Sequence, residues 1–137
     1  MGRYRGFSLL EVMIAVLILG VGLLGMATLQ LQALRSGQAA LNSTEVTQAA
    51  NLVVDLMRAN RGAALSGQYD LTLGEQPAGS SQAADDLRYW RQMLTNLPSG
   101  DGSILVVQGR VTVTIQWSPR PVAGEEDLRS FELRADL

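Results

Sequence analysis

Apolar residues in this 137-residue chain are concentrated near the N-terminus. The sixteen residues from Val12 to Ala27 carry no polar side chain, and the longer stretch from Phe7 to Leu29 contains only Ser8, Glu11 and Thr28 as polar residues. A helix rises about 1.5 Å per residue, so this stretch of 23 residues reaches roughly 35 Å, enough to cross the core of a bilayer. The pattern predicts a membrane-spanning helix followed by a soluble domain.

Helical periodicity continues beyond Leu29. Apolar positions recur at spacings of three and four residues, which indicates one buried face. These positions are Leu31, Leu34, Leu41, Val46, Ala49, Val53 and Leu56. No proline interrupts the run, and Asn60-Arg61-Gly62 is typical of a helix C-terminus. We therefore predict one helix from about Phe7 to Asn60. A coiled coil is the competing interpretation, but the apolar repeat has gaps.

The C-terminal third alternates with the period of two that is typical of strands. Ile104 to Val107 and Val111 to Trp117 are separated by Gln108-Gly109, which predicts an antiparallel hairpin, and Phe131 to Leu137 alternates again. The expected three-stranded sheet needs cover on one face, and the second half of the long helix can supply it. The fold class is therefore α+β, a long N-terminal helix packed on a small antiparallel β-sheet.

Three further segments connect these elements. Ala63 to Ala84 is rich in Gly, Ser and Ala, which predicts a loop in which Leu71 and Leu73 add a short strand or pack locally. Asp85 to Leu97 is a second helix candidate, with either Asp85 or Ser81 suited to cap it. Its single tryptophan, Trp90, is interpreted as core. Ser118 to Asp127 contains two prolines and is expected to be a connecting loop.

The composition argues against an enzyme. The chain has no Cys and no His, and all eleven of its basic residues are Arg. Without Cys or His it lacks the commonest nucleophile-activating base, the thiolates and the usual transition-metal ligands, so we expect no catalytic site, no metal and no cofactor. The net charge of −2 does not suggest direct nucleic-acid binding. Asp85-Asp86 and Glu125-Glu126-Asp127 are acidic clusters, but neither has calcium-loop spacing, and we interpret both as solvated surface.

The charges around the apolar stretch suggest its orientation. Arg3 and Arg5 precede it, and the next basic residue is Arg35. By the positive-inside rule, the N-terminus lies in the cytoplasm and the globular part outside. Glu11 is a charge within the apolar run. It either lies at the level of the lipid headgroups or waits for a positive partner in a protein assembly.

The residues Gly6-Phe7-Ser8-Leu9-Leu10-Glu11, preceded by a short basic leader, resemble the signal of type IV prepilins. The resemblance implies cleavage between Gly6 and Phe7 by a prepilin peptidase and N-methylation of Phe7, with Arg3 and Arg5 as the leader charges. It also implies that Glu11 meets the N-terminal amine of a neighbouring subunit during assembly.

Gly20, Gly22 and Gly25 interrupt the apolar helix. They serve either close packing between helices or a weak stretch that unwinds in the fibre.

The stretch from Gly20 to Gln30 resembles the minor-pilin subgroup called PilV, the type IV pilus modification proteins. The turn Leu97 to Gly100 and the Val-rich strand ending at Trp117 fit the same subgroup. Many pilins carry a C-terminal disulfide loop, which this Cys-free chain cannot form.

The resemblance implies a minor pilin that helps to prime pilus assembly and is incorporated at or near the fibre tip. Its expected partners are other minor pilins, the major pilin, the prepilin peptidase and the inner membrane, with twitching motility and adhesion as indirect outcomes. Residues 1–6 are then the leader, 7–34 the transmembrane and assembly half of the helix, and 35–137 a periplasmic head that later lies in the surface pilus. The alternatives are a pseudopilin of type II secretion and a membrane-anchored enzyme or solute-binding protein.

Overall fold

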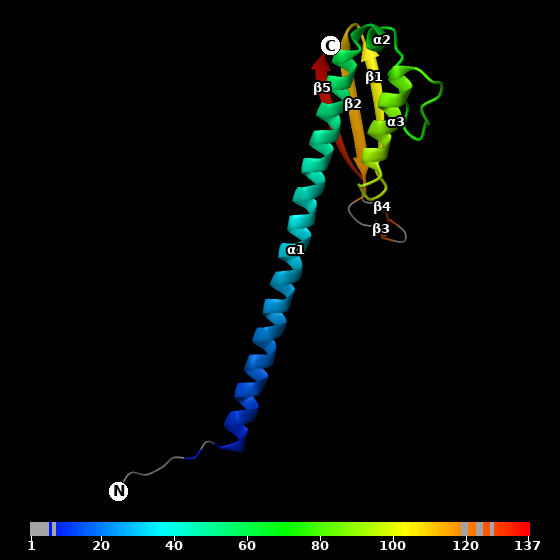
Figure 1. Cartoon of the computed structure of the whole chain (residues 1–137). Helices are drawn as coiled ribbons and strands as arrows, with labels where there is room; N and C mark the ends of the chain where they lie inside the picture. Colours follow the sequence, from blue (N-terminus) through cyan, green and yellow to red (C-terminus); the bar gives the residue numbers. More distant parts are fainter. Residues whose placement is uncertain (1–5, 7, 119–120, 123–124, 127) are drawn as a thin grey trace. The chain divides into compact units, whose positions relative to one another are not determined.

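The computed structural model describes residue 6 and residues 8–118, 121–122, 125–126 and 128–137. Its elements, shown in Figure 1, are α1 (Leu9–Ala59), α2 (Arg61–Leu65), α3 (Gln82–Leu94), β1 (Asp101–Val107), β2 (Arg110–Trp117), β3 (Pro121–Val122), β4 (Glu125–Glu126) and β5 (Arg129–Asp136). The chain divides into two compact units, and the boundary follows Ala39. The expected α+β class is confirmed, with a long N-terminal helix and a small antiparallel sheet.

The long helix α1 is continuous over 51 residues. Its sequence is rich in Leu and Ala and free of proline, so no residue forces a break. The predicted stop at Asn60 is confirmed, but α2 follows from Arg61 and extends to Leu65, into the region expected to be a loop from Ala63 onward. That loop prediction was wrong at its start because Ala64 is completely buried in the core and is held there by one more helical turn.

The sheet has the strand order β1-β2-β5 and is antiparallel throughout. β1 and β2 form the predicted hairpin, and its two loop residues, Gln108 and Gly109, have positive φ angles of 53° and 79°. Two successive positive φ values are typical of a type I′ turn, whose twist matches that of the strands. The region expected as a connecting loop after Trp117 contains β3 and β4, which pair with each other as a two-residue ladder.

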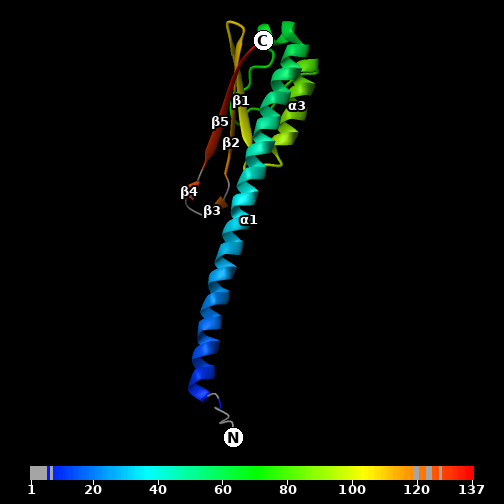
Figure 2. The same ribbon diagram turned by 90° about the vertical axis from the view of Figure 1, so that its left-hand side faces the viewer.

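One face of the sheet is covered by helices from the same unit. The second half of α1 lies over this face, as predicted, and α3 lies on the same side (Figure 2). Val111, Val113 and Ile115 of β2 point into this layer and are completely buried. The alternation of apolar and polar residues along β2 therefore separates the core face from the outer face.

The buried face of α1 differs in part from the predicted one. Its buried residues are Asn42, Val46, Ala49, Ala50, Val53, Val54 and Met57. Leu41, which the spacing placed on this face, is 61% exposed, and Leu31 and Leu34 are exposed as well. Leu41 precedes the buried Asn42 by one residue, which turns its side chain 100° around the helix and away from the core.

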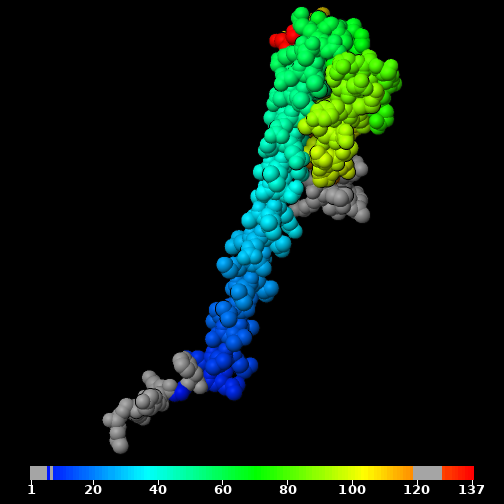
Figure 3. Space-filling view, in the orientation of Figure 1, coloured from blue at the N-terminus to red at the C-terminus, as the bar shows by residue number. Residues whose placement is uncertain are grey.

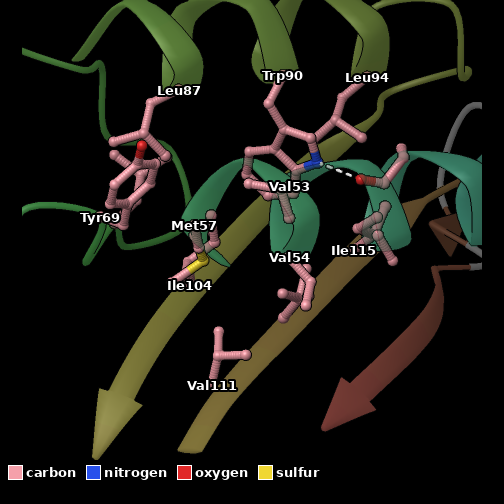
Figure 4. Close-up of a cluster of buried hydrophobic side chains, with 14 of the residues drawn as sticks. Val53, Val54, Met57, Tyr69, Leu87, Trp90, Leu94, Ile104, Val111 and Ile115 are labelled. Atoms are coloured by element: carbon pink, nitrogen blue, oxygen red, sulfur yellow. Dashed lines mark hydrogen bonds between the residues drawn. The ribbon is translucent and has the colours of Figure 1, made fainter. Parts of the chain in front are cut away.

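Trp90 of α3 lies where α1, α3 and β1 meet. Its side chain is completely buried, and its indole Nε1–H donates to the carbonyl of Ala49 at 3.0 Å (Figure 4). An indole N–H buried in a core needs such a partner. The interpretation of Trp90 as core is confirmed.

Helix α3 begins three residues before the predicted Asp85 and ends before the predicted Leu97. Its cap is Ser81, whose hydroxyl accepts from the Ala84 N–H at 3.2 Å. Of the two candidate caps, the structure therefore uses Ser81 and not Asp85.

A buried polar network joins the end of α1, the following loop and α3. The hydroxyl of Tyr69 donates to the carboxylate of Asp86, which also accepts from Gln82 Nε2 at 2.8 Å, and Asn60 Nδ2 donates to the Tyr69 oxygen at 3.3 Å. Burial and the neighbouring carboxylate raise the pKa of Tyr69 to about 12. Asp86 is buried, so its interpretation as solvated surface was wrong, because the phenol and the amide stand in for water.

Replacing Gly102 by Ala is expected to destabilise the fold by about 1–3 kcal/mol through overpacking. A Cβ on Gly102 would lie 2.5 Å from Cη2 of Trp90 and 2.9 Å from Cδ1 of Leu94. Thermal unfolding of the full-length protein in detergent measures the effect. Gly62→Ala is the matched control, since nothing lies within 4 Å of a Cβ there. Equal stability of the two variants would contradict the packing argument.

The Tyr69→Phe variant is expected to be less stable than the wild type at pH 7, by about 1–3 kcal/mol, because Asp86 loses a donor. The folded pKa of Tyr69 is raised from 10.0 to about 12, so its contribution is complete below pH 10 and is lost between pH 10 and 12. The difference in Tm between wild type and variant should therefore shrink over that range. A difference that stays constant up to pH 12 would rule out this role.

Candidate functional site: the N-terminal helix

The first half of α1 presents apolar side chains on all sides. Its large apolar residues from Leu9 to Leu34 range from 48% exposed at Ile14 to 80% at Leu9. Figure 3 draws this segment in space-filling form, in dark to light blue. An apolar surface of this extent needs lipid or another protein to cover it.

Length and composition make α1 suitable for crossing a membrane. An 18-residue window within it has a mean hydropathy of 2.6, and none of that window is buried inside the protein. A core helix of a soluble protein would instead be largely buried. The exposure of every side of the segment therefore agrees with the predicted membrane-spanning helix.

Ser8 starts the helix. Its hydroxyl accepts from the backbone N–H of Glu11 at 3.2 Å, and its carbonyl accepts from the N–H groups of Glu11 and Val12 at 3.0 and 3.3 Å. A Ser or Thr followed three residues later by Glu is a known signal for a helix start. That signal is present in the sequence, so the role of Ser8 at the helix start could have been predicted from Ser8 and Glu11.

Glu11 lies in the first turn of α1. A carboxylate there faces the positive end of the helix dipole, which is worth about 0.3–1 kcal/mol at an exposed position. Within the described part of the chain, no Arg side chain forms an ion pair with Glu11. Its carboxylate is therefore available to a positive group of another molecule, such as the one that the sequence analysis expects.

Among the described residues, nothing packs closely against the glycines of the apolar segment. Gly20, Gly22 and Gly25 lie inside continuous helix, and a Cβ at each would meet nothing within 4 Å. Thr28, the remaining polar residue of the segment, donates its hydroxyl to the carbonyl of Leu24 at 3.0 Å. Both interpretations of the glycines, close packing between helices and local unwinding, stay predictions.

The other predicted site residues lie at the edge of the described region. Gly6 is exposed and precedes the helix. Phe7, Arg3 and Arg5 lie outside the described residues. The structure thus brings Ser8 and Glu11 together at the helix start, with Gly6 just upstream, and the processing of the Gly6–Phe7 bond stays a prediction.

The acidic clusters do not come together in the described region. Asp85 pairs with Arg88 at 2.7 Å, and Asp86 belongs to the buried network with Tyr69. The side chains of Glu125, Glu126 and Asp127 lie outside the described residues. The part of the chain that the structure describes contains no group of three or more metal-ligating side chains.

Comparison with known protein families gives one match. Residues 1–27 match the family described as "Prokaryotic N-terminal methylation motif". No curated protein and no solved structure gave a significant match. The motif and the α+β fold together support a structural protein similar to type IV pilins and pseudopilins, anchored by its apolar helix, processed by a prepilin peptidase and assembled with other pilins.

Proposed function

We propose that this protein is a minor pilin of a type IV pilus, which helps to prime pilus assembly and is incorporated at or near the fibre tip. The observation that carries the proposal is a methylation motif leading into an apolar, exposed segment of helix, residues 9–34, whose single charge is Glu11. In a subunit that is only anchored in a membrane, this carboxylate gains no more than about 0.3–1 kcal/mol, from the helix dipole. An assembly subunit uses it as a contact to its neighbour.

Processing comes first in this proposal. Arg3 and Arg5 hold the leader on the cytoplasmic side, and the prepilin peptidase cuts between Gly6 and Phe7. Residues 1–6 are removed, and the new N-terminus at Phe7 is methylated. Residues 7–34 then form the membrane and assembly half of the helix, and residues 35–137 form a head in the periplasm.

Assembly follows from electrostatics in an apolar medium. An unpaired carboxylate near the bilayer core costs about 2.5–3.5 kcal/mol on insertion scales, and less near the interface. Pairing with the positive amine at Phe7 of a neighbouring subunit lowers that cost and fixes the axial position of one subunit against the next. Glu11 therefore determines where a subunit stops as it enters the growing fibre.

The choice of a minor pilin rests on the sequence from Gly20 to Gln30 and on the head. The segment resembles the PilV subgroup, and the head carries a three-stranded sheet on one helical layer. Both features fit a subunit that joins other minor pilins and the major pilin and that affects twitching motility and adhesion indirectly. A pseudopilin of type II secretion shares the motif, and recovery of the protein from sheared surface pili distinguishes the two functions.

Replacing Gly6 by Val is expected to block maturation. The peptidase must bring the backbone of the Gly6–Phe7 bond close to its catalytic groups, and a β-branched side chain hinders that approach. Mass spectrometry of the protein from its own cells should show the leader retained in more than about nine-tenths of the variant molecules. The matched control is Gly2→Val, which lies in the leader away from the bond. An unchanged mature N-terminus at Phe7 in the Gly6→Val variant would disprove the cleavage site.

The Glu11→Ala variant is expected to insert into the membrane as the wild type does, because the apolar segment is unaffected. Its amount in sheared pili should fall by about tenfold, corresponding to the loss of about 1.4 kcal/mol of pairing free energy. Immunoblots of membrane and pilus fractions measure both quantities. Ser8→Ala is the control for a change in the helix start alone. Normal incorporation of Glu11→Ala would exclude the role of the carboxylate in assembly.

A further inference from the structure

The edge of the sheet at β1 is covered by the chain itself. Leu71 and Ile104 exchange backbone hydrogen bonds of 2.9 and 2.8 Å, and the N–H of Val106 donates to Asp70 Oδ1 at 2.9 Å. The segment before α3 therefore occupies this edge, and a further strand would have to displace it there.

The edge at β5 presents the backbone groups of alternate residues. In antiparallel sheets, residues direct their N–H and C=O groups alternately to the two sides. Ile104 in β1 bonds outward to Leu71, so it does not bond to Val113, its partner in β2. Val113 therefore bonds on its other side, to Leu133 in β5. The residues of β5 that direct their backbone groups away from the sheet are Ser130, Glu132, Arg134 and Asp136. Within the described part of the chain, these groups receive one hydrogen bond, from Arg58 Nη2 to the carbonyl of Asp136 at 3.1 Å.

The two residues that flank Leu133 carry opposite charges. Glu132 and Arg134 lie on the outer face of the sheet, are exposed and pair with each other at 2.6 Å. If a second β5 lies antiparallel to the first with Leu133 opposite Leu133, Glu132 of each copy lies opposite Arg134 of the other. Ser130 then lies opposite Asp136. All four are outward residues, so each of these pairs is a hydrogen-bonded pair, and the charged pairs attract across the strands.

Neighbouring registers are less favourable. Sliding one strand by one residue sets outward residues opposite inward ones, and the ladder of hydrogen bonds is lost. Sliding it by two residues sets Glu132 opposite Glu132 in one direction and Arg134 opposite Arg134 in the other, and like charges in that position repel. The sequence of β5 therefore favours the register centred on Leu133.

The inner face of β5 fits the same register. Phe131, Leu133 and Ala135 face the helical layer and are only half-buried, whereas their partners in β2 are completely buried. In the register centred on Leu133, the two leucines meet at the centre, and Phe131 of each copy lies opposite Ala135 of the other. A large side chain opposite a small one fills the space without overlap. The pairing therefore covers apolar surface that a single copy leaves half-exposed.

We propose that the β5 edge binds the β5 edge of a second copy of this chain, antiparallel and centred on Leu133, so that the two three-stranded sheets form one sheet of six strands. Such a contact has two-fold symmetry, so every favourable pair occurs twice. The contact uses residues 130–136 of the head alone. It makes no use of the first half of α1, and it does not depend on the proposed function.

Cysteines introduced into β5 test the register, because the chain has no Cys of its own. The full-length Leu133→Cys variant places two thiols at the centre of the pair, where Cα atoms about 4.5 Å apart lie within reach of a disulfide. In Ala135→Cys, the matched control on the same face, the two positions are four residues apart along the strands, about 14 Å. Both variants are oxidised with copper phenanthroline in a detergent extract of membranes from their own cells. We expect at least tenfold more disulfide-linked pair from Leu133→Cys.

Charge reversals test the attraction between Glu132 and Arg134. Glu132→Arg and Arg134→Glu each set like charges opposite each other, so either one should lower the disulfide yield of Leu133→Cys about tenfold. The variant that carries both reversals restores opposite charges, and its yield should return to within twofold of the original. The two single reversals, mixed with different tags, should form a mixed pair equally well. Both side chains are exposed, and unfolding curves verify that the variants keep their fold.

Sedimentation equilibrium in a density-matched detergent measures the association without any cysteine. We expect the full-length wild type to associate into pairs, and Glu132→Arg to associate at least tenfold more weakly. If Leu133→Cys does not fold, this comparison decides.

Equal disulfide yields from folded Leu133→Cys and Ala135→Cys would overturn the inference. So would charge reversals that change neither the yield nor the association. An adduct of Leu133→Cys with a different protein, in place of a second copy, would assign the edge to another partner and overturn it as well.

Discussion

Burial of one face of α1 against α3 and the sheet is the contact on which the head of this protein depends. Val46, Val53 and Met57 are buried between the helices and the sheet. The carbonyl oxygen of Ala49 accepts a hydrogen bond from the indole N–H of Trp90. Without this part of α1, the inward face of the sheet would lose most of its cover. Because the sheet has only three strands, it cannot form a core by itself.

The same helix satisfies two different environments along its length. Its first half is apolar on every side and exposed, and its last five turns bury one face and expose polar residues on the other. Lipid or neighbouring helices can cover the first half, and only the head covers the second. The change occurs within one continuous helix.

A chain without Cys must hold its head by packing and hydrogen bonds alone. The loop between α2 and α3 is held by hydrogen bonds at two places. Tyr69 bonds to Asp86 of α3, and Asp70 and Leu71 bond to the backbone of β1. The loop therefore covers the β1 edge of the sheet. It also carries the buried hydroxyl of Tyr69, which forms its hydrogen bond with Asp86 of α3. The other edge, at β5, has no such cover within the described residues.

The long helix, the hairpin and the apolar character of the N-terminal segment could all be predicted from the sequence. Local signals carry these features: an apolar run without proline, a strict period of two in β2, and a Gln108-Gly109 turn. The sequence did not reveal that α2 follows Asn60, that Asp86 is buried or that Leu41 is exposed. These three features depend on contacts between residues that are distant in the sequence. Which sheet edge the described residues cover could be learned only from the folded chain, because strand pairing joins residues far apart in the sequence, and periodicity carries no information about such neighbours.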